Sequence, residues 1–328
     1  MGKIPTRDLL NEFFNTDVGK SRIKGRTVLD NPNLYEYEEK IQKELVDMND
    51  DELVNLVDNL ISDKDVEVNT LTSSTVQYTT ALLKAVFNYY IGNYDKIINP
   101  FTYNVERMTS AKLFEELCGR KKPYTMDYVN EVMSRVRVQE SETKADYYES
   151  IILLAYNGFA SPKEIVNLKE RMIDHRTKTV ALSGRTIKLS DRCYELLVKV
   201  HNYSGSIDNP RFVWAGWKDT YYKYCTRNGR IEDFDNMVLF KLVSSLNNTI
   251  SKINNKLSPK AVVDFSKLYR LGFYDFLIEK YGKDRTNQIL TSNRVTQDVN
   301  DLLSAARIYG INSANPTALK NDLIPFIR

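Results

Sequence analysis

The sequence predicts a mainly α-helical protein of two domains that carries one small β-hairpin or sheet. Apolar residues recur every three or four positions over most of the chain, which is the spacing of amphipathic helices. Two short β-prone arms around Ser183-Gly184 are the one clear hairpin signal. The stretch "CGRKKPYT", at 118–125, combines Gly, Pro and basic residues and is typical of an interdomain linker.

The composition is that of a globular chain. With 328 residues, 42% of them hydrophobic and 27% charged, the protein is long enough for about two ordinary domains. No apolar run reaches the roughly 20 residues of a membrane helix, and the N-terminus lacks the pattern of a signal peptide, so we expect a cytoplasmic protein without a membrane partner. Three scattered cysteines and two histidines indicate neither a disulfide framework nor a metal site, and no cofactor is expected.

The charge is distributed unevenly along the chain. The net charge is +3, but residues 34–65 contain eleven acids and three bases, so the remaining residues carry +11. This asymmetry permits a basic face that binds nucleic acid. On charge alone a solvated acidic surface is the favoured explanation, because charge runs are usually exposed faces.

The first domain is expected to be entirely helical. Residues 1–33 include "GKSRIKGRTVLDNPN", which has little periodicity, and we interpret this segment as an extended N-terminal arm or a disordered tail. The helical domain follows over residues 34–119. Its first two helices lie between 34 and 61, and Asn49 with Glu52 predicts a capping box before the second.

A long helix dominates the second half of this domain. Ser73 or Ser74 is its expected cap, and Gly92 is its expected end. Another helix is expected at 110–118, and the basic linker occupies residues 120–124.

The second domain is expected over residues 125–328. It begins with a helix at 125–136 and a second at 144–156, followed by a Gly turn, the hairpin and a helix capped by Ser190. Later elements are a short strand or buried loop at 211–217 and helices at 237–255, 259–280, 284–291, 296–309 and 316–326.

Several stretches, taken in order, resemble the tyrosine recombinases, the phage integrase family. "SSTVQYTTALLKAVFNYYIGNYDKIINPF" looks like the helical core-binding domain of that family. "IILLAYNGFASPKEIVNLKERMIDHRTKTVAL" resembles the first catalytic box, and "DFSKLYRLGFYDFLIEKYG" resembles the second. The resemblance covers roughly residues 70–290. It implies a two-domain C-clamp around duplex DNA, formed by a core-binding domain and a degenerate integrase catalytic-like domain with a C-terminal helix.

The family's chemistry requires residues that this sequence lacks. A tyrosine attacks a DNA phosphate, two arginines and a histidine or tryptophan neutralise the phosphoryl oxygens, and a hairpin lysine protonates the leaving oxygen. The first arginine position falls on Ala160 or Ser161, depending on the alignment. Lys188 is the only candidate for the acid. Lys267-Leu-Tyr-Arg270 replaces the second box's His-x-x-Arg, which leaves Arg270 as the one arginine that maps.

The nucleophile is also displaced. Its position falls near residues 302–304, which are Leu, Leu and Ser, and Tyr309 lies five to seven residues later in an apolar stripe. We therefore expect no enzyme activity and interpret Tyr309 as a packing residue.

The resemblance leads us to expect a sequence-specific double-stranded DNA-binding protein that regulates transcription. It is similar to the integrase-like lysogeny repressors of SPbeta-type Bacillus phages, which would place it in a host bacterial cytoplasm as a prophage repressor bound to an operator. The candidate DNA-binding residues lie in the long helix, the linker, the hairpin and the second box: Ser73, Ser74, Thr75, Gln77, Lys84, Lys121, Lys122, Arg185, Lys188, Lys267 and Arg270.

Other interpretations remain open from sequence. An active recombinase with a displaced site would use Arg270, Lys188 and Tyr309, and a protein-binding scaffold would use the acidic segment 34–65. Lys84 is equally explained as a surface residue and Arg270 as a member of an intramolecular ion pair, and the alternation of Lys188 with Ile187 favours an ordinary exposed strand residue. The C-terminal helix "PTALKNDLIPFIR" can dock on its own domain or on a second subunit. Any anti-repressor protein or peptide is invisible in the sequence.

Overall fold

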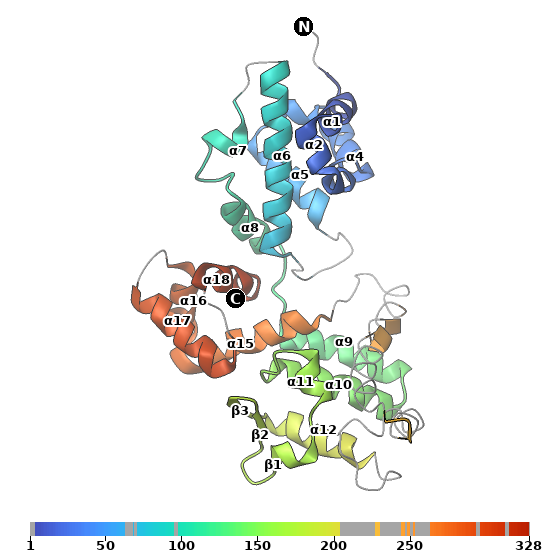
Figure 1. The fold of residues 1–328 in the computed structure, drawn as a ribbon, viewed down its shortest axis with the longest axis vertical. Helices are drawn as coiled ribbons and strands as arrows, with labels where there is room; N and C mark the ends of the chain where they lie inside the picture. The colour runs from blue at the N-terminus through green and yellow to red at the C-terminus, as the bar shows by residue number, and fades with distance from the viewer. Residues whose placement is uncertain are drawn as a thin grey trace. The chain divides into compact units, whose positions relative to one another are not determined.

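The computed structural model describes residues 4–62, 68, 71–94, 98–203, 227–229, 244–246, 248–249, 252, 263–292, 296–311 and 315–327. The chain divides into two compact units, Met1–Pro123 and Tyr124–Arg328 (Figure 1). The division falls within the stretch 120–124 that we expected to be a linker. The described residues are mainly helical and include a small three-stranded antiparallel sheet, as predicted. No described helix is both long enough and apolar enough to span a membrane.

The first unit begins with helices rather than with an arm. These are α1 (Thr6–Asn15), α2 (Asp17–Ser21), the 3-10 turn η1 (Ile23–Gly25) and α3 (Arg26–Leu29). The expectation of an extended arm or disordered tail over residues 1–33 is therefore wrong for the described residues. The physical reason is an apolar stripe in α1, which is almost completely buried and consists of Leu9, Leu10, Phe13 and Phe14.

The next two helices are α4 (Pro32–Ile41) and α5 (Asp50–Ile61), with a 3-10 turn, η2 (Leu45–Asp47), between them. The predicted capping box is confirmed. The Glu52 N–H donates to Asn49 Oδ1 at 2.9 Å, and the Asn49 N–H donates to Glu52 Oε2 at 2.8 Å. These two bonds satisfy backbone donors that the first turn of α5 would otherwise leave without partners.

Helix α6 (Ser73–Asn93) is the longest of the first unit's described helices and packs against α1, α5, α7 (Pro100–Tyr103) and α8 (Ser110–Gly119). Its cap is Thr72, whose hydroxyl accepts from the Thr75 N–H, and not Ser73 or Ser74. The helix therefore starts one residue earlier than a Ser73 cap would allow, and two earlier than a Ser74 cap would allow. Its other end is Asn93, one residue beyond the expected Gly92.

The second unit is built around helix α10 (Glu142–Tyr156). Every residue of α10 from Ala145 to Ala155 is buried, because α9 (Met126–Gln139), α12 (Asp191–Asn202) and α15 (Phe265–Tyr281) all pack against it. The short α11 (Pro162–Val166) and the 3-10 turn η3 (Glu170–Met172) follow α10. Ser190 caps α12 as predicted, since its hydroxyl accepts from the Cys193 N–H.

The predicted hairpin is present and gains a third strand. Strands β1 (Ile173–Asp174), β2 (Thr179–Leu182) and β3 (Arg185–Lys188) form an antiparallel sheet in that order. Val180 pairs with Ile187, and Gly184 turns the hairpin at a φ of +81°, where glycine is favoured. Strand β1 has only two residues, which is too short to show an alternating pattern in the sequence.

The C-terminal helices are α16 (Lys283–Thr291), α17 (Thr296–Tyr309) and α18 (Pro316–Leu323), with a final 3-10 turn, η5 (Ile324–Phe326). Helix α18 packs on α15, α16 and α17, so in this structure it docks on its own unit. The strand or loop expected at 211–217 lies outside the described residues, as does most of the helix expected at 237–255.

Candidate nucleic-acid interface

The structure places the eleven sequence-predicted site residues on both units. The first unit carries those of the long helix and the linker: Ser73, Ser74, Thr75, Gln77, Lys84, Lys121 and Lys122. The second unit carries those of the hairpin and the second box: Arg185, Lys188, Lys267 and Arg270.

Helix α6 presents a polar face to solvent. Gln77, Ala81 and Lys84 are exposed along one side of the helix, and Tyr78, beside them, is 43% exposed. The spacing of these residues follows the helical repeat, and the opposite side is buried in the core. Within the described part of the chain, neither the Gln77 amide nor the Lys84 ammonium has a hydrogen-bond or ion-pair partner. Both groups are therefore available to a ligand.

The hydroxyls at the start of α6 are partly engaged in the cap. Thr72 Oγ1 lies 3.1 Å from Ser74 Oγ and 2.8 Å from Thr75 Oγ1. Ser73 is half-buried, whereas Ser74 and Thr75 are exposed. In the linker, Lys122 is exposed and Lys121 is half-buried. The first unit thus offers cations, hydroxyls and an amide, but the structure does not join them into one enclosed pocket among the described residues.

Arg185 points inward from β3. Its Nη2 donates to the Gly158 carbonyl at 2.9 Å and to Glu164 Oε2 at 2.9 Å, and only 15% of its side chain is exposed. Glu164 also accepts from the Ala160 N–H at 2.7 Å. Gly310 covers the other side of the guanidinium, because a Cβ there would lie 2.4 Å from Arg185 Nε. Arg185 therefore holds the turn after α10 in place, and Glu164 neutralises its charge.

Arg270 is neutralised in the same way. Its Nη2 lies 2.6 Å from Asp322 of α18, and its Nη1 donates to Ser266 one turn earlier. The structure therefore shows the intramolecular ion pair that was one of the alternatives for Arg270. Lys267 is half-buried, and its backbone N–H donates to the Asp264 side chain at 2.9 Å as part of the α15 cap. A phosphate that bound Arg185 would have to displace Glu164, and one that bound Arg270 would have to displace Asp322.

Tyr309 is held by packing and by a hydrogen bond. Its hydroxyl donates to the Tyr156 carbonyl at 2.6 Å, and its ring lies 5.2 Å from Phe273 and 5.5 Å from Phe276, centroid to centroid. Gly272 makes this contact possible, since a Cβ there would lie 2.3 Å from Tyr309 Oη. Burial raises the pKa of Tyr309 well above its ordinary value. A hydroxyl with a raised pKa is a weaker nucleophile near neutral pH.

Lys188 and Tyr309 line one cavity of about 500 Å³. Asp275 and Glu279 of α15 line it too, and Asp275 accepts from the Tyr156 hydroxyl at 2.7 Å. Arg270 is not among the lining residues. An active recombinase with a displaced site would use Lys188, Tyr309 and Arg270. The first two thus line the same cavity, and Arg270 does not. Two carboxylates beside one lysine make this cavity unfavourable for a phosphate.

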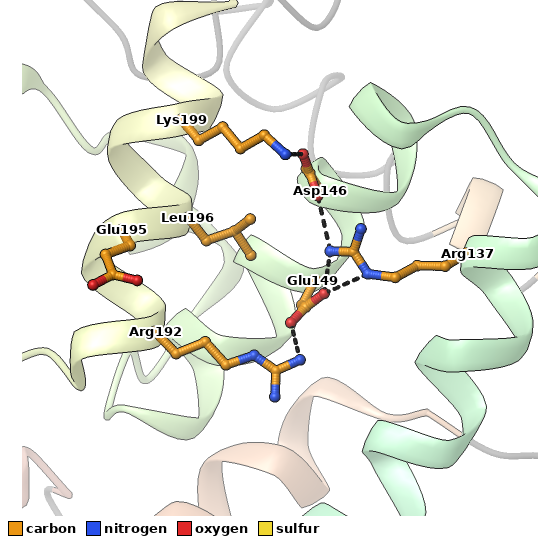
Figure 2. Close-up of a pocket in the computed structure, with 7 residues that line it drawn as sticks. All are labelled: Arg137, Asp146, Glu149, Arg192, Glu195, Leu196 and Lys199. Carbon is orange, nitrogen blue, oxygen red and sulfur yellow. Dashed lines mark hydrogen bonds and ion pairs between the residues drawn. The ribbon is translucent and has the colours of Figure 1, made fainter.

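The second unit also holds an ion-pair network that the sequence analysis missed. Asp146 and Glu149 of α10 are 1% and 4% exposed, and three cations from α9 and α12 surround them (Figure 2). Arg137 Nη2 lies 2.8 Å from Asp146, and Lys199 Nζ lies 2.7 Å from the same carboxylate. Arg137 and Arg192 both contact Glu149.

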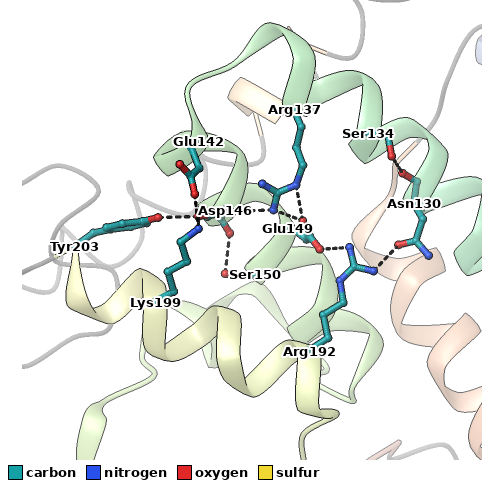
Figure 3. Close-up of polar contacts among 10 residues, drawn as sticks. All are labelled: Asn130, Ser134, Arg137, Glu142, Asp146, Glu149, Ser150, Arg192, Lys199 and Tyr203. Atoms are coloured by element: carbon teal, nitrogen blue, oxygen red, sulfur yellow. Dashed lines mark hydrogen bonds and ion pairs between the residues drawn. The ribbon is translucent and has the colours of Figure 1, made fainter.

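Further polar contacts complete the network (Figure 3). The Tyr203 hydroxyl donates to Asp146 at 2.7 Å, and Lys199 also contacts Glu142 at 2.6 Å. Burial by itself raises the pKa of Asp146, but the hydrogen bonds from Lys199, Tyr203 and Arg137 outweigh it, and the net pKa lies below 3.8. A cavity of about 350 Å³ opens between these side chains.

This network is structural in character. The three cations face the two buried carboxylates together with Glu142 and Glu195, so no surplus positive charge remains for an anionic ligand. These ion pairs hold α9 and α12 against the central helix α10. The stretch "ADYYESIILLAY" contains a sequence signal for this network. Two acids three residues apart interrupt an otherwise apolar helix, and buried acids need cationic partners.

Among the residues that the structure describes, no group of three or more His, Cys, Asp or Glu side chains could hold a metal ion. No protein-family model and no curated protein matches this chain. The site is therefore interpreted from its own geometry.

Proposed function

We propose that this chain is a sequence-specific double-stranded DNA-binding protein with an inactive tyrosine-recombinase-like fold. It acts as a transcriptional repressor in the cytoplasm of a bacterial host, where it maintains the lysogeny of a prophage. The observation that carries this proposal is the exposed face of α6, on which Gln77 and Lys84 have no partner among the described residues.

The chemistry of that face suits a base edge and a phosphate. The major groove of duplex DNA is about 12 Å wide and accepts an α-helix. A glutamine amide can donate to and accept from adenine at once, so Gln77 reads a base. Lys84 lies about two turns further along α6, where it contacts guanine or a backbone phosphate.

The absence of catalysis in this proposal is supported by charge pairing. Arg270, the one arginine that maps onto the family's phosphate ligands, contacts Asp322 of α18, and Arg185 of the hairpin contacts Glu164 of α11. The transition state of phosphoryl transfer needs cations that are not already neutralised. In the proposed C-clamp these two arginines stabilise the second unit instead of neutralising a DNA phosphate.

Selection of bound fragments from genomic DNA tests the proposal. A shared, palindromic or repeated sequence among the retained fragments is the expected result, because a repressor must distinguish its operator from other DNA. Retention of random fragments would contradict sequence specificity, and retention of none would favour the protein-binding scaffold.

A further inference from the structure

A turn in the first unit carries three cations that have no ion pair to a residue the structure describes. We name the segment 20–24 the basic turn; its cationic residues are Lys20, Arg22 and Lys24. Lys20 and Lys24 are exposed, and Arg22 is half-buried. None of the three has an ion pair to a described residue, whereas Arg26, just after the turn, is paired with Asp30 at 3.1 Å.

Tight backbone packing fixes the start of this segment. The Thr16 hydroxyl accepts from the Gly19 N–H at 3.0 Å and caps α2. Gly19 lies so close to α1 that a Cβ there would be 1.9 Å from the Phe13 carbonyl oxygen. The basic turn therefore follows a rigid corner.

The end of the segment is packed directly on α6. A Cβ at Gly25 would lie 2.6 Å from a methyl of Leu82 and 2.9 Å from the Tyr78 hydroxyl. Tyr78 neighbours Gln77 on the exposed face of α6, and α1, which precedes α2, packs on α6 in the first unit (Figure 1). Gly25, the residue after the basic turn, is thus a neighbour of Tyr78 although the two are about 50 positions apart in the sequence.

We propose that the basic turn grips the sugar-phosphate backbone of the same DNA duplex whose major groove α6 enters. This inference rests on the proposed function and adds a second contact element to it. Lysine and arginine side chains next to a groove-reading helix fix its register through phosphate contacts that carry no sequence information. Asp17 is the one acid in the segment 17–26, so the segment attracts a polyanion.

The exposed apolar side chains of the turn fit the same ligand. Ile23, between Arg22 and Lys24, is 51% exposed, and Val18, just before the turn, is 57% exposed. Apolar side chains at that position make van der Waals contact with deoxyribose while the flanking cations reach the phosphates on either side. An acidic polypeptide is the other ligand that matches the charge, and the experiment separates the two.

The test uses the full chain and a duplex fragment that the wild-type protein retains. Lys20→Ala and Lys24→Ala are compared with Lys40→Ala, a matched control because Lys40 is an exposed lysine of α4 in the same unit. Each substitution in the basic turn should lower the slope of log affinity against log salt by about 0.9, since one phosphate contact is lost. The loss of affinity should be equal on specific and unrelated duplexes, and Lys40→Ala should behave as wild type.

The outcomes distinguish this inference from the proposed function. Unchanged slopes for both basic-turn variants, with wild-type binding intact, would overturn the inference and leave the proposed function standing. No retention of duplex by the wild-type protein would overturn both. Binding of polyglutamate that depends on Lys20 and Lys24, without such dependence for duplex DNA, would assign the basic turn to an acidic protein partner. Thermal melting of each variant confirms that these exposed substitutions leave the fold intact.

Discussion

Arg185 of β3 and Glu164 of α11 form a 2.9 Å ion pair that closes the turn following the central helix α10. Arg185 comes from the hairpin, points toward the protein interior and also donates to the Gly158 carbonyl at 2.9 Å. Its cation is therefore part of the fold, and Glu164 neutralises it.

Arg185→Ala should destabilise the second unit by about 2 kcal/mol, because it leaves Glu164 and the Gly158 carbonyl without their donor. Denaturant unfolding measures this change. Arg176→Ala is the control, since Arg176 is exposed in the turn between β1 and β2, and it should change the free energy of unfolding by less than about 0.5 kcal/mol. If both substitutions changed the free energy of unfolding by the same amount, the contacts of Arg185 with Glu164 and the Gly158 carbonyl would not stabilise the fold.

Placing an arginine at Ala160 should not restore DNA cleavage. Arg270 would still be paired with Asp322, and Tyr309 would still donate its hydroxyl to the Tyr156 carbonyl. The measurement is trapping of a covalent protein–DNA adduct on a nicked duplex, with wild type, Ala160→Arg and Tyr309→Phe side by side. An adduct that forms with wild type and disappears in Tyr309→Phe would establish an active recombinase.

Asp146→Asn should cost about 3 kcal/mol of unfolding free energy, since it leaves Arg137 and Lys199 facing a neutral group in a buried network. Glu142→Gln is the matched control, because Glu142 also contacts Lys199 but is 74% exposed, and it should cost less than about 0.5 kcal/mol.

The effect of Asp146→Asn should depend on pH. The folded-state pKa of Asp146 is below 3.8, so the ionised carboxylate contributes stability above that pH and loses the contribution as pH falls through the folded-state pKa. The difference in unfolding free energy between wild type and variant should therefore be constant near neutral pH and shrink in acid below about pH 4. A difference that grows on acidification would contradict the assigned ion pairs.

Gln77→Ala should relax sequence specificity at one base pair of the bound site by about 1–3 kcal/mol, with little change in binding to unrelated duplex. Lys84→Ala should weaken binding to both if Lys84 contacts a phosphate. Competition binding with a panel of single-base variants of the selected site resolves the two effects. Retention of the wild-type base preference by Gln77→Ala would remove this residue from the reading face.

The sequence predicted the elements that depend on local pattern. Asn49 and Glu52 form the expected capping box, and the Ser183-Gly184 turn forms the expected hairpin, because capping and turn formation involve residues close in the chain. The prediction for residues 1–33 is wrong because the apolar pairs of α1 precede a Gly- and Lys-rich stretch, and that stretch gives the whole segment the composition of a tail.

Ion pairs between residues far apart in the chain could not be predicted from the sequence. Nothing in the local sequence of Arg185 or Arg270 indicates that Glu164, 21 residues earlier, or Asp322, 52 residues later, neutralises it. The same holds for the segment 20–24, which is followed by Gly25, packed closely on Leu82 and Tyr78 of α6. Such contacts depend on tertiary packing, which brings together residues that are distant in the sequence.

The most direct test of the central claim is filter binding of the selected duplex by the wild-type protein at two salt concentrations. The account predicts tight retention at low salt, a steep loss of affinity as salt rises because several counterions are released, and preference for the selected site over an unrelated duplex. Absence of retained duplex, or retention that is independent of both salt and sequence, would contradict the claim that this chain is a sequence-specific DNA-binding protein.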